Sequence, residues 1–182
     1  MTTANLGTYA AAVPPVHFEI VHEFDIPLDA VELAVLSPNL IDQLAPRLSN
    51  MEQVEQTSHA MNNGTFERVW SYHANVRIPA FAKSHLTREM LGWDEHSVYD
   101  LKKHSAKWTI VPKVKPAWRK YFHSEGTYQL VATPSGTRRI IKGDLALNVP
   151  VVRKVAERMI LAEVKKTFDA EAATLRDMAT LI

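Results

Sequence analysis

Apolar and polar residues alternate near the start of the chain, from Val16 to Phe24. A period of two is typical of a β-strand with one buried face. The pattern places Phe18, Ile20 and His22 on the same side as the two end residues, so we expect these three side chains to point inward.

Three prolines divide the segment that follows, residues 25–46. Pro27 fits the first turn of a helix, Pro38 ends that helix and begins the next, and Pro46 closes the second. We therefore expect two short helices directly after the first strand.

Residues 50–149 mostly show the composition of strands, rich in β-branched and aromatic residues. The run 61–64 ends in Asn-Gly, a strong hairpin signal because both residues tolerate a positive φ. One exception is 78–91, where the apolar spacing indicates a short amphipathic helix that could cover one end of the sheet or gate entry to it. We expect strands at 51–59, 65–76, 93–101, 106–112, 119–131 and 137–149.

The last part of the chain predicts one long helix. Pro150 fits a first helical position, and neither Gly nor Pro follows it. The apolar residues form a stripe too broad for contact with a single helix, so we expect a curved sheet around it. Gly126 and Gly143 lie inside neighbouring strands and permit sharp coiling. The stripe consists of Val152, Val155, Ala156, Met159, Ile160, Ala162, Val164, Phe168, Ala172 and Leu175.

These elements define an α+β fold in which a seven-stranded curved antiparallel sheet wraps around a long C-terminal helix. Residues 1–15 lack periodicity and end in two prolines, so we expect a flexible lead-in. Residues 16–182 have the length and apolar content of a single domain.

The strand order and the terminal stretch GTRRIIKGDLALNVPVVRKVAERMILAEVKKTFDAEAATL resemble the START-like (SRPBCC) superfamily, and within it an uncharacterised bacterial branch with a similar ending. The resemblance covers residues 16–178. It implies the helix-grip fold, in which sheet and helix enclose a deep cavity. Members of the superfamily carry lipids, sterols or polyketides, or act as cyclases or as chaperone-binding modules, so the resemblance does not select one activity.

The composition limits the function classes. No cysteine is present, which excludes disulfides and thiolate chemistry, and no segment resembles a secretory signal or a membrane span, so we expect a cytoplasmic protein. Residues 101–120 contain seven bases and no acid. They predict either a solvated basic hairpin or transient contact with an anionic membrane surface. The pI of about 8.0 argues against nucleic acid as a partner.

Glu163 is the most informative polar residue of the helix, because helical spacing places it beside apolar positions. A carboxylate that faces the sheet needs a partner, for which we consider His22, Arg68 and Tyr99. Alternatively the helix turns enough for Glu163 to reach solvent or to pair with Lys166 or Lys142. In the first case Glu163 would hold a ligand or act as an acid or base.

Inward strand positions carry many aromatic side chains, which either fill the core or line a pocket. If a pocket exists, Phe81 lies in the helix that could gate it. The ligand-binding candidates are Phe18, Ile20, His22, Arg68, Trp70, Tyr72, Phe81, Trp93, Tyr99, Trp108, Leu145, Met159, Ile160 and Glu163.

We find no metal-site spacing among the eight histidines, and no nucleotide-binding or serine-hydrolase motif. We therefore expect neither a metal nor a cofactor. The sequence favours a non-catalytic binder or carrier of a hydrophobic small molecule, such as a lipid, a fatty acid or a polyketide. The alternatives are a cyclase, dehydratase or hydrolase that uses Glu163, His22 and Tyr99, and an interaction module that docks through residues 101–120.

Overall fold

Seven antiparallel strands form one sheet in the order β1-β7-β6-β5-β4-β3-β2. The structure, a computed structural model, describes residues 14–75, 91–148 and 153–181. The strands are β1 (Val16–Phe24), β2 (Met51–Asn62), β3 (Thr65–Ala74), β4 (Gly92–Asp100), β5 (Ser105–Pro112), β6 (Phe122–Thr133) and β7 (Gly136–Leu147). The helices are α1 (Leu28–Leu36), α2 (Leu40–Leu44), α3 (Pro116–Arg119) and α4 (Arg153–Ala179), with a 3₁₀ turn η1 at Ala45–Arg47.

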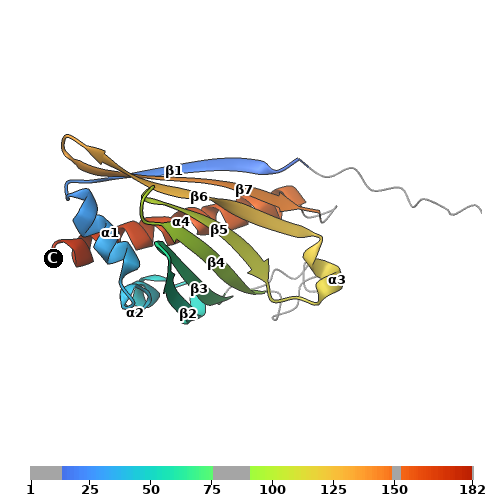
Figure 1. The fold of residues 1–182 in the computed structure, drawn as a ribbon. Helices are drawn as coiled ribbons and strands as arrows, with labels where there is room; N and C mark the ends of the chain where they lie inside the picture. The colour runs from blue at the N-terminus through green and yellow to red at the C-terminus, as the bar shows by residue number, and fades with distance from the viewer. Residues whose placement is uncertain (1–13, 76–90, 149–152, 182) are drawn as a thin grey trace, which may run out of the picture.

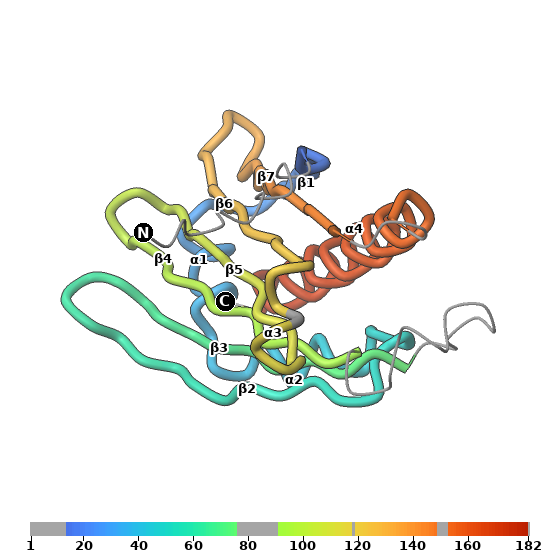
Figure 2. Tube along the Cα trace, turned by 90° about the vertical axis from the view of Figure 1, so that its right-hand side faces the viewer, coloured from blue at the N-terminus to red at the C-terminus, as the bar shows by residue number. Residues whose placement is uncertain are grey.

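The sheet curves around the long helix α4, which lies along its concave side (Figure 1). Seen from the end, the strands form an arc that is open on one side, and α4 occupies the opening (Figure 2). Helices α1 and α2 also contact α4. The predicted α+β helix-grip architecture is therefore confirmed, including the two short helices after the first strand.

The local signals of the sequence act as expected in two places. Residues of β1 alternate between exposed and half-buried up to the buried Phe24, because one face of the strand packs on the core. Asn63 (φ 47°) and Gly64 (φ 85°) form the two-residue turn between β2 and β3, a conformation that these residues tolerate well.

One expectation about the elements changes, and another falls outside the described residues. The strand predicted from residue 119 begins at Phe122, since Pro116 starts the short helix α3 before it. The short helix predicted at 78–91 falls almost entirely in residues 76–90, outside the described part. Within the described part, no helix is both long and apolar enough to cross a bilayer.

Candidate functional site

A small cavity lies in the interior between the sheet and α4. Its volume is about 30 Å³, which is room for about two water-sized groups and far below the ~300–1,000 Å³ of typical ligand pockets. The deep cavity implied by the resemblance is thus largely filled by side chains of the protein itself. Its lining consists of Val35, Phe66, Arg68, Glu95, Ser97, Tyr99, Ala106, Trp108, Tyr128, Arg139, Phe168 and Glu171.

An ion cluster occupies one side of this cavity. Arg139 of β7 is 1% exposed, and its Nη2 donates a hydrogen bond to Glu171 of α4. Arg68 of β3 places its Nη2 3.7 Å from the other oxygen of Glu171 and donates from Nη1 to the carbonyl of Val35, at 3.1 Å. Its guanidinium also lies 3.7 Å above the ring of Trp70. Two arginines therefore share one carboxylate, in a core where an unpaired charge is costly.

Several hydrogen-bond donors in this interior have no partner among the residues that the structure describes. They are Nε and Nη1 of Arg139, the hydroxyl of Tyr128 and the indole Nε1 of Trp108, all buried. A buried donor without a partner costs about 1–3 kcal/mol, so this arrangement favours an oxygen-rich group in the cavity.

Glu95 supplies the second carboxyl group that lines the cavity. Burial raises its pKa to about 7, an effect that Arg68 opposes and the negative charge of Glu171 reinforces. None of the hydrogen bonds found among the described residues involves its carboxyl group. The Glu95 residue is half-buried at the wall of the cavity, and it can gain or lose a proton near neutral pH.

Two tyrosines of the cavity stay protonated at neutral pH. Burial raises the pKa of Tyr128. Burial also raises the pKa of Tyr99, whose hydroxyl donates to Oε1 of Glu32 at 2.6 Å. The same Glu32 oxygen accepts a hydrogen bond from His104 at 2.7 Å, so Glu32 lies in a separate group at the edge of the cavity.

A row of four residues across adjacent strands explains how the interior is filled. Trp108 pairs with Gly126, Gly126 with Gly143, and Gly143 with Phe18. The ring centroids of Trp108 and Phe18 are 6.2 Å apart, across the two glycines. A methyl group at Gly143 would lie 2.7 Å from Cζ2 of Trp108, and one at Gly126 would overlap the same ring. The two glycines were predicted to permit sharp coiling of their strands. The structure shows that they also leave room for the rings of Trp108 and Phe18.

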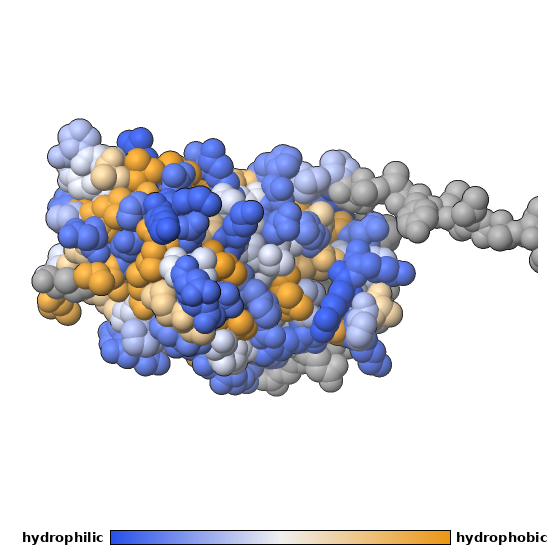
Figure 3. All heavy atoms as spheres, viewed as in Figure 1, coloured by the Kyte–Doolittle hydropathy of each residue, from blue (hydrophilic) through white to orange (hydrophobic). Residues whose placement is uncertain are grey.

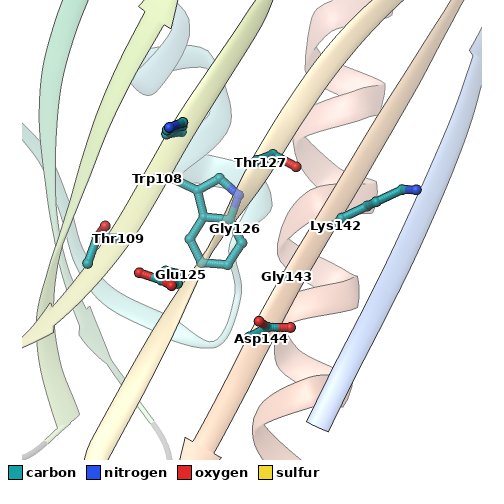
Figure 4. A pocket seen from close by; sticks show the side chains of 9 residues that line it. Trp108, Thr109, Glu125, Gly126, Thr127, Lys142, Gly143 and Asp144 are labelled. Atoms are coloured by element: carbon teal, nitrogen blue, oxygen red, sulfur yellow. The ribbon is translucent and has the colours of Figure 1, made fainter. Parts of the chain in front are cut away.

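A larger hollow of about 410 Å³ involves the same strands but is built differently. Figure 4 shows it from close by, with Thr109, Glu125, Thr127 and Lys142 among its lining residues. These four side chains are exposed and of mixed charge, so water already solvates them. The small interior cavity, with its buried charges and unpaired donors, is therefore the candidate site.

The structure brings three of the predicted site residues to this cavity, namely Arg68, Tyr99 and Trp108. Burial raises the pKa of Tyr72, and the nearby charges of Glu95 and Glu171 raise it further. The remaining candidates from the strands pack around them. Trp70 and Leu145 are buried, whereas Phe18, Ile20 and Trp93 are half-buried, and Trp93 stacks on Tyr72.

His22 points toward α4, as its strand position indicates, and its side chain is 10% exposed. Its Nε2 pairs with Asp169 at 3.0 Å, and its Nδ1 has no partner among the described residues. Burial lowers the pKa of His22, while the bond to Asp169 opposes this shift. His22 therefore does not meet Glu163 or Tyr99, and the predicted catalytic group of these three residues is not assembled.

Glu163 itself is half-buried and does not line the cavity. Asn50 donates to its Oε2 at 2.5 Å and Lys166 to its Oε1 at 2.7 Å. The alternative with Lys166 is thus the one observed, and the expected contacts with His22, Arg68 or Tyr99 are wrong. Glu171, two turns further along α4, holds the position between the arginines.

The first half of α4 is turned away from the predicted orientation. Met159 is 51% exposed and Val155 55% exposed, whereas Ile160 is half-buried and Glu157 is buried beside Arg153. The expectation that Met159 contacts the interior is therefore wrong. Phe81, the remaining candidate, lies outside the described residues.

Sequence reasoning missed Glu95, Arg139 and Glu171 as site residues, and it placed Tyr128 among the inward aromatic side chains without including it in the candidates. Two were readable from the alternation of their strands: Glu95 is in phase with Trp93 and Tyr99, and Arg139 with Ile141 and Leu145. Glu171 lies one turn from Phe168 and Leu175 on α4, which is a weaker signal. Among the described residues, no group of His, Asp and Glu could hold a metal ion.

The curved antiparallel sheet wrapped around α4 is the helix-grip fold. The chain belongs to the family described as "Protein of unknown function (DUF2505)", whose model matches residues 19–178. Among curated proteins, no sequence matches the chain.

Solved structures with the same fold extend over nearly the whole chain. The Zhui aromatase/cyclase from Streptomyces sp. R1128 has 16% identity and a TM-score of 0.61, covering 91% of this chain and 94% of its own. TTHA0849 from Thermus thermophilus has 16% identity and a TM-score of 0.58, covering 92% and 98%. Norcoclaurine synthase from Thalictrum flavum has 14% identity and a TM-score of 0.55, covering 95% and 96%. At these identities the similarity establishes the fold.

Proposed function

We propose that this protein binds a small hydrophobic molecule that carries a polar, oxygen-bearing end, in the interior between the sheet and α4. The observation that carries this proposal is the group of buried donors on Arg139, Tyr128 and Trp108 that have no partner among the described residues. Four unpaired donors together cost several kcal/mol at about 1–3 kcal/mol each, and ligand oxygens would recover that cost.

The aromatic walls suit the apolar part of such a ligand. Trp108 and Phe168 lie with ring centroids 6.3 Å apart, on β5 and α4 respectively. Because the cavity holds only about 30 Å³, a ligand enters only if these rings or α4 shift, so binding selects a more open state. This requirement favours compact, ring-sized ligands over a full-length lipid chain, whose volume is much larger.

The experiment is binding of 8-anilinonaphthalene-1-sulfonate, a fluorescent aromatic anion, together with native mass spectrometry of the protein purified from its host. We expect the dye to bind with a blue shift and the Trp108→Ala variant to bind it with altered affinity. As a control, Lys142→Ala alters the exposed hollow on the outer face, which Trp108 also lines, and removes the ion pair of Lys142 with Glu19. Absence of dye binding and of any co-purified ligand would contradict the proposal.

A second candidate function is catalysis on a similar ligand. It is favoured by Glu95, whose pKa of about 7 suits an acid or base at neutral pH, beside arginines that could stabilise an oxyanion. Two proteins of similar fold are named as an aromatase/cyclase and a synthase. The test is α-proton exchange of 4-phenyl-2-butanone in deuterated water: acceleration by the wild type and not by Glu95→Gln would support catalysis, and no acceleration would argue against it.

A further inference from the structure

Charges within the candidate site nearly cancel, and the balance depends on one group. Arg68 and Arg139 contribute two positive charges, and Glu171, in contact with both, contributes one negative charge. Glu95 is the remaining carboxyl group that lines the cavity. When Glu95 is ionised the set is neutral, and when Glu95 is protonated one positive charge is left over.

That excess positive charge lies next to the unpaired donors. Nε and Nη1 of Arg139 are buried and take no part in its hydrogen bond with Glu171, which uses Nη2. Tyr128 packs against the same guanidinium, whose Cζ is 4.8 Å from the centre of the tyrosine ring. N–H and O–H groups around a guanidinium are well suited to bind the oxygens of an anion.

We propose that this interior is a proton-coupled binding site for a small organic monoanion with an apolar body. The anion accepts hydrogen bonds from Arg139, Tyr128 and Trp108, and Glu95 takes up a proton as the anion enters. This inference rests on the proposed function and adds the charge of the ligand and the regulation of its binding.

The coupling follows from charge neutrality in a buried site. With an anion bound and Glu95 ionised, two arginines would face three negative charges in a medium of low dielectric constant, which is unfavourable. Protonation of Glu95 restores balance. The site then holds the anion in neutral surroundings, and releases it when Glu95 loses its proton.

Other titratable groups around Glu95 do not replace it in this role. Tyr72 on β3, Tyr99 on β4 and Tyr128 on β6 all have raised pKa values and stay neutral. From α4, Glu171 is paired with the two arginines and Asp169 with His22 and Lys165. Glu32 of α1 accepts hydrogen bonds from Tyr99 and His104. Glu95 is thus the acid in this set that has neither an ion pair nor a hydrogen bond among the described residues.

The sign of the pH effect follows from the pKa of Glu95, which burial raises to about 7. At pH 7 about half of the ligand-free molecules already carry the proton, so anion binding takes up about half a proton, and nearly one proton at pH 8. Affinity for the anion is therefore highest below pH 7. Above pH 7 it falls by up to about tenfold per pH unit.

The experiment is isothermal titration calorimetry of the whole protein with 2-naphthoate, with 2-naphthylmethanol as the matched neutral compound. Titrations at pH 6, 7 and 8, in two buffers with different ionisation enthalpies, give the number of protons taken up. We expect 2-naphthoate to bind with proton uptake that grows from pH 6 to 8. The alcohol should bind more weakly at pH 6 and without proton uptake.

Two variants assign the proton. Glu95→Gln should bind 2-naphthoate at pH 8 about as well as the wild type does at pH 6, with no proton uptake. Glu67→Gln, an exposed carboxylate on the neighbouring strand, should behave as the wild type. Circular dichroism of each variant checks that it is folded.

Uptake of a proton that persists in Glu95→Gln would overturn the inference. So would equal affinity for naphthoate and naphthylmethanol, or no binding of naphthoate at pH 6. If the alcohol or the fluorescent dye still binds in the interior, the proposed function stands while the anion-coupled mechanism fails. If none of the three compounds binds, both fail.

Discussion

At the scale of single residues, the interior combines a fully paired carboxylate with one that has no hydrogen bond among the described residues. Glu171 contacts both arginines, whereas Glu95 lines the same cavity alone. Burial disfavours the ionised form of a carboxyl group unless opposite charges or donors compensate. The difference between these two acids therefore comes from their neighbours, since the side chains are chemically identical.

This difference predicts how stability depends on pH. Because the folded-state pKa of Glu95 is about 7 and the ordinary value is 4.5, the folded protein holds an additional proton between these pH values. The contribution of Glu95 to the free energy of unfolding is thus fully present below pH 4.5. It is lost as pH rises through 7, by at most about 3 kcal/mol. Urea unfolding of Glu95→Gln should lack this loss, so the variant gains relative to the wild type from pH 5 to pH 8. Parallel pH profiles for the wild type and the variant would contradict the assignment, and Glu67→Gln serves as the control.

At the scale of elements, the curvature of the sheet depends on the row Trp108–Gly126–Gly143–Phe18 across β5, β6, β7 and β1. Glycine has no side chain, so large rings from the flanking strands can lie over the middle two strands. The same rings fill the interior and limit the cavity. Sheet curvature and cavity size therefore share one cause.

Gly126→Ala should destabilise the protein by about 1–3 kcal/mol, because its methyl group would overlap the Trp108 ring and the Lys142 carbonyl oxygen. The control is Gly92→Ala in β4, where the nearest atom is Cδ of the flexible Lys113 side chain, at 3.2 Å. We expect a much smaller change there. Urea unfolding gives both free energies, and near-ultraviolet circular dichroism reports whether Trp108 moves. Equal losses in the two variants would argue against the packing explanation.

At the scale of the whole molecule, the basic segment 101–120 does not form one surface. It begins in the loop after β4, crosses the sheet as β5 and ends just after α3. Because β5 has eight residues and a strand rises about 3.3 Å per residue, the two ends are roughly 25 Å apart. That distance exceeds the Debye length of about 8–10 Å, and the two ends act independently. Figure 3 shows a face with mostly hydrophilic residues and scattered hydrophobic ones.

Contact with an anionic membrane remains a prediction, and the structure indicates which end to test. Lys115, Arg119 and Lys120 near α3 have no ion pair within the described part. At the other end Lys103 pairs with Asp100 at 3.1 Å, whereas Lys102 and Lys107 have no ion pair among the described residues. In flotation with phosphatidylserine vesicles, changing the three α3 residues to Glu should abolish binding. The matched control is the change of Lys102, Lys103 and Lys107 to Glu, which should have a small effect. Equal effects, or no flotation of the wild type, would argue against a membrane role for α3.

Much of the architecture was predictable because its signals are local. The alternation of β1, the Asn63-Gly64 turn and the long helix without Gly or Pro each depend on residues close in sequence. The site was predicted less well. Arg68, Tyr99 and Trp108 were found from strand phase, but Glu163 was chosen where Glu171 holds the arginines. On a helix of 27 residues, a small error in rotation exchanges one carboxylate for another.

The sequence by itself determined the kinds and order of the elements and the inward face of each strand, because a period of two or 3.6 needs only neighbouring residues. The tertiary structure alone decided which charges meet. Arg139 and Glu171 come from β7 and α4, and the rotation of α4 over the sheet brings them together. Packing across the whole domain sets that rotation, and it also sets the burial that raises the pKa of Glu95.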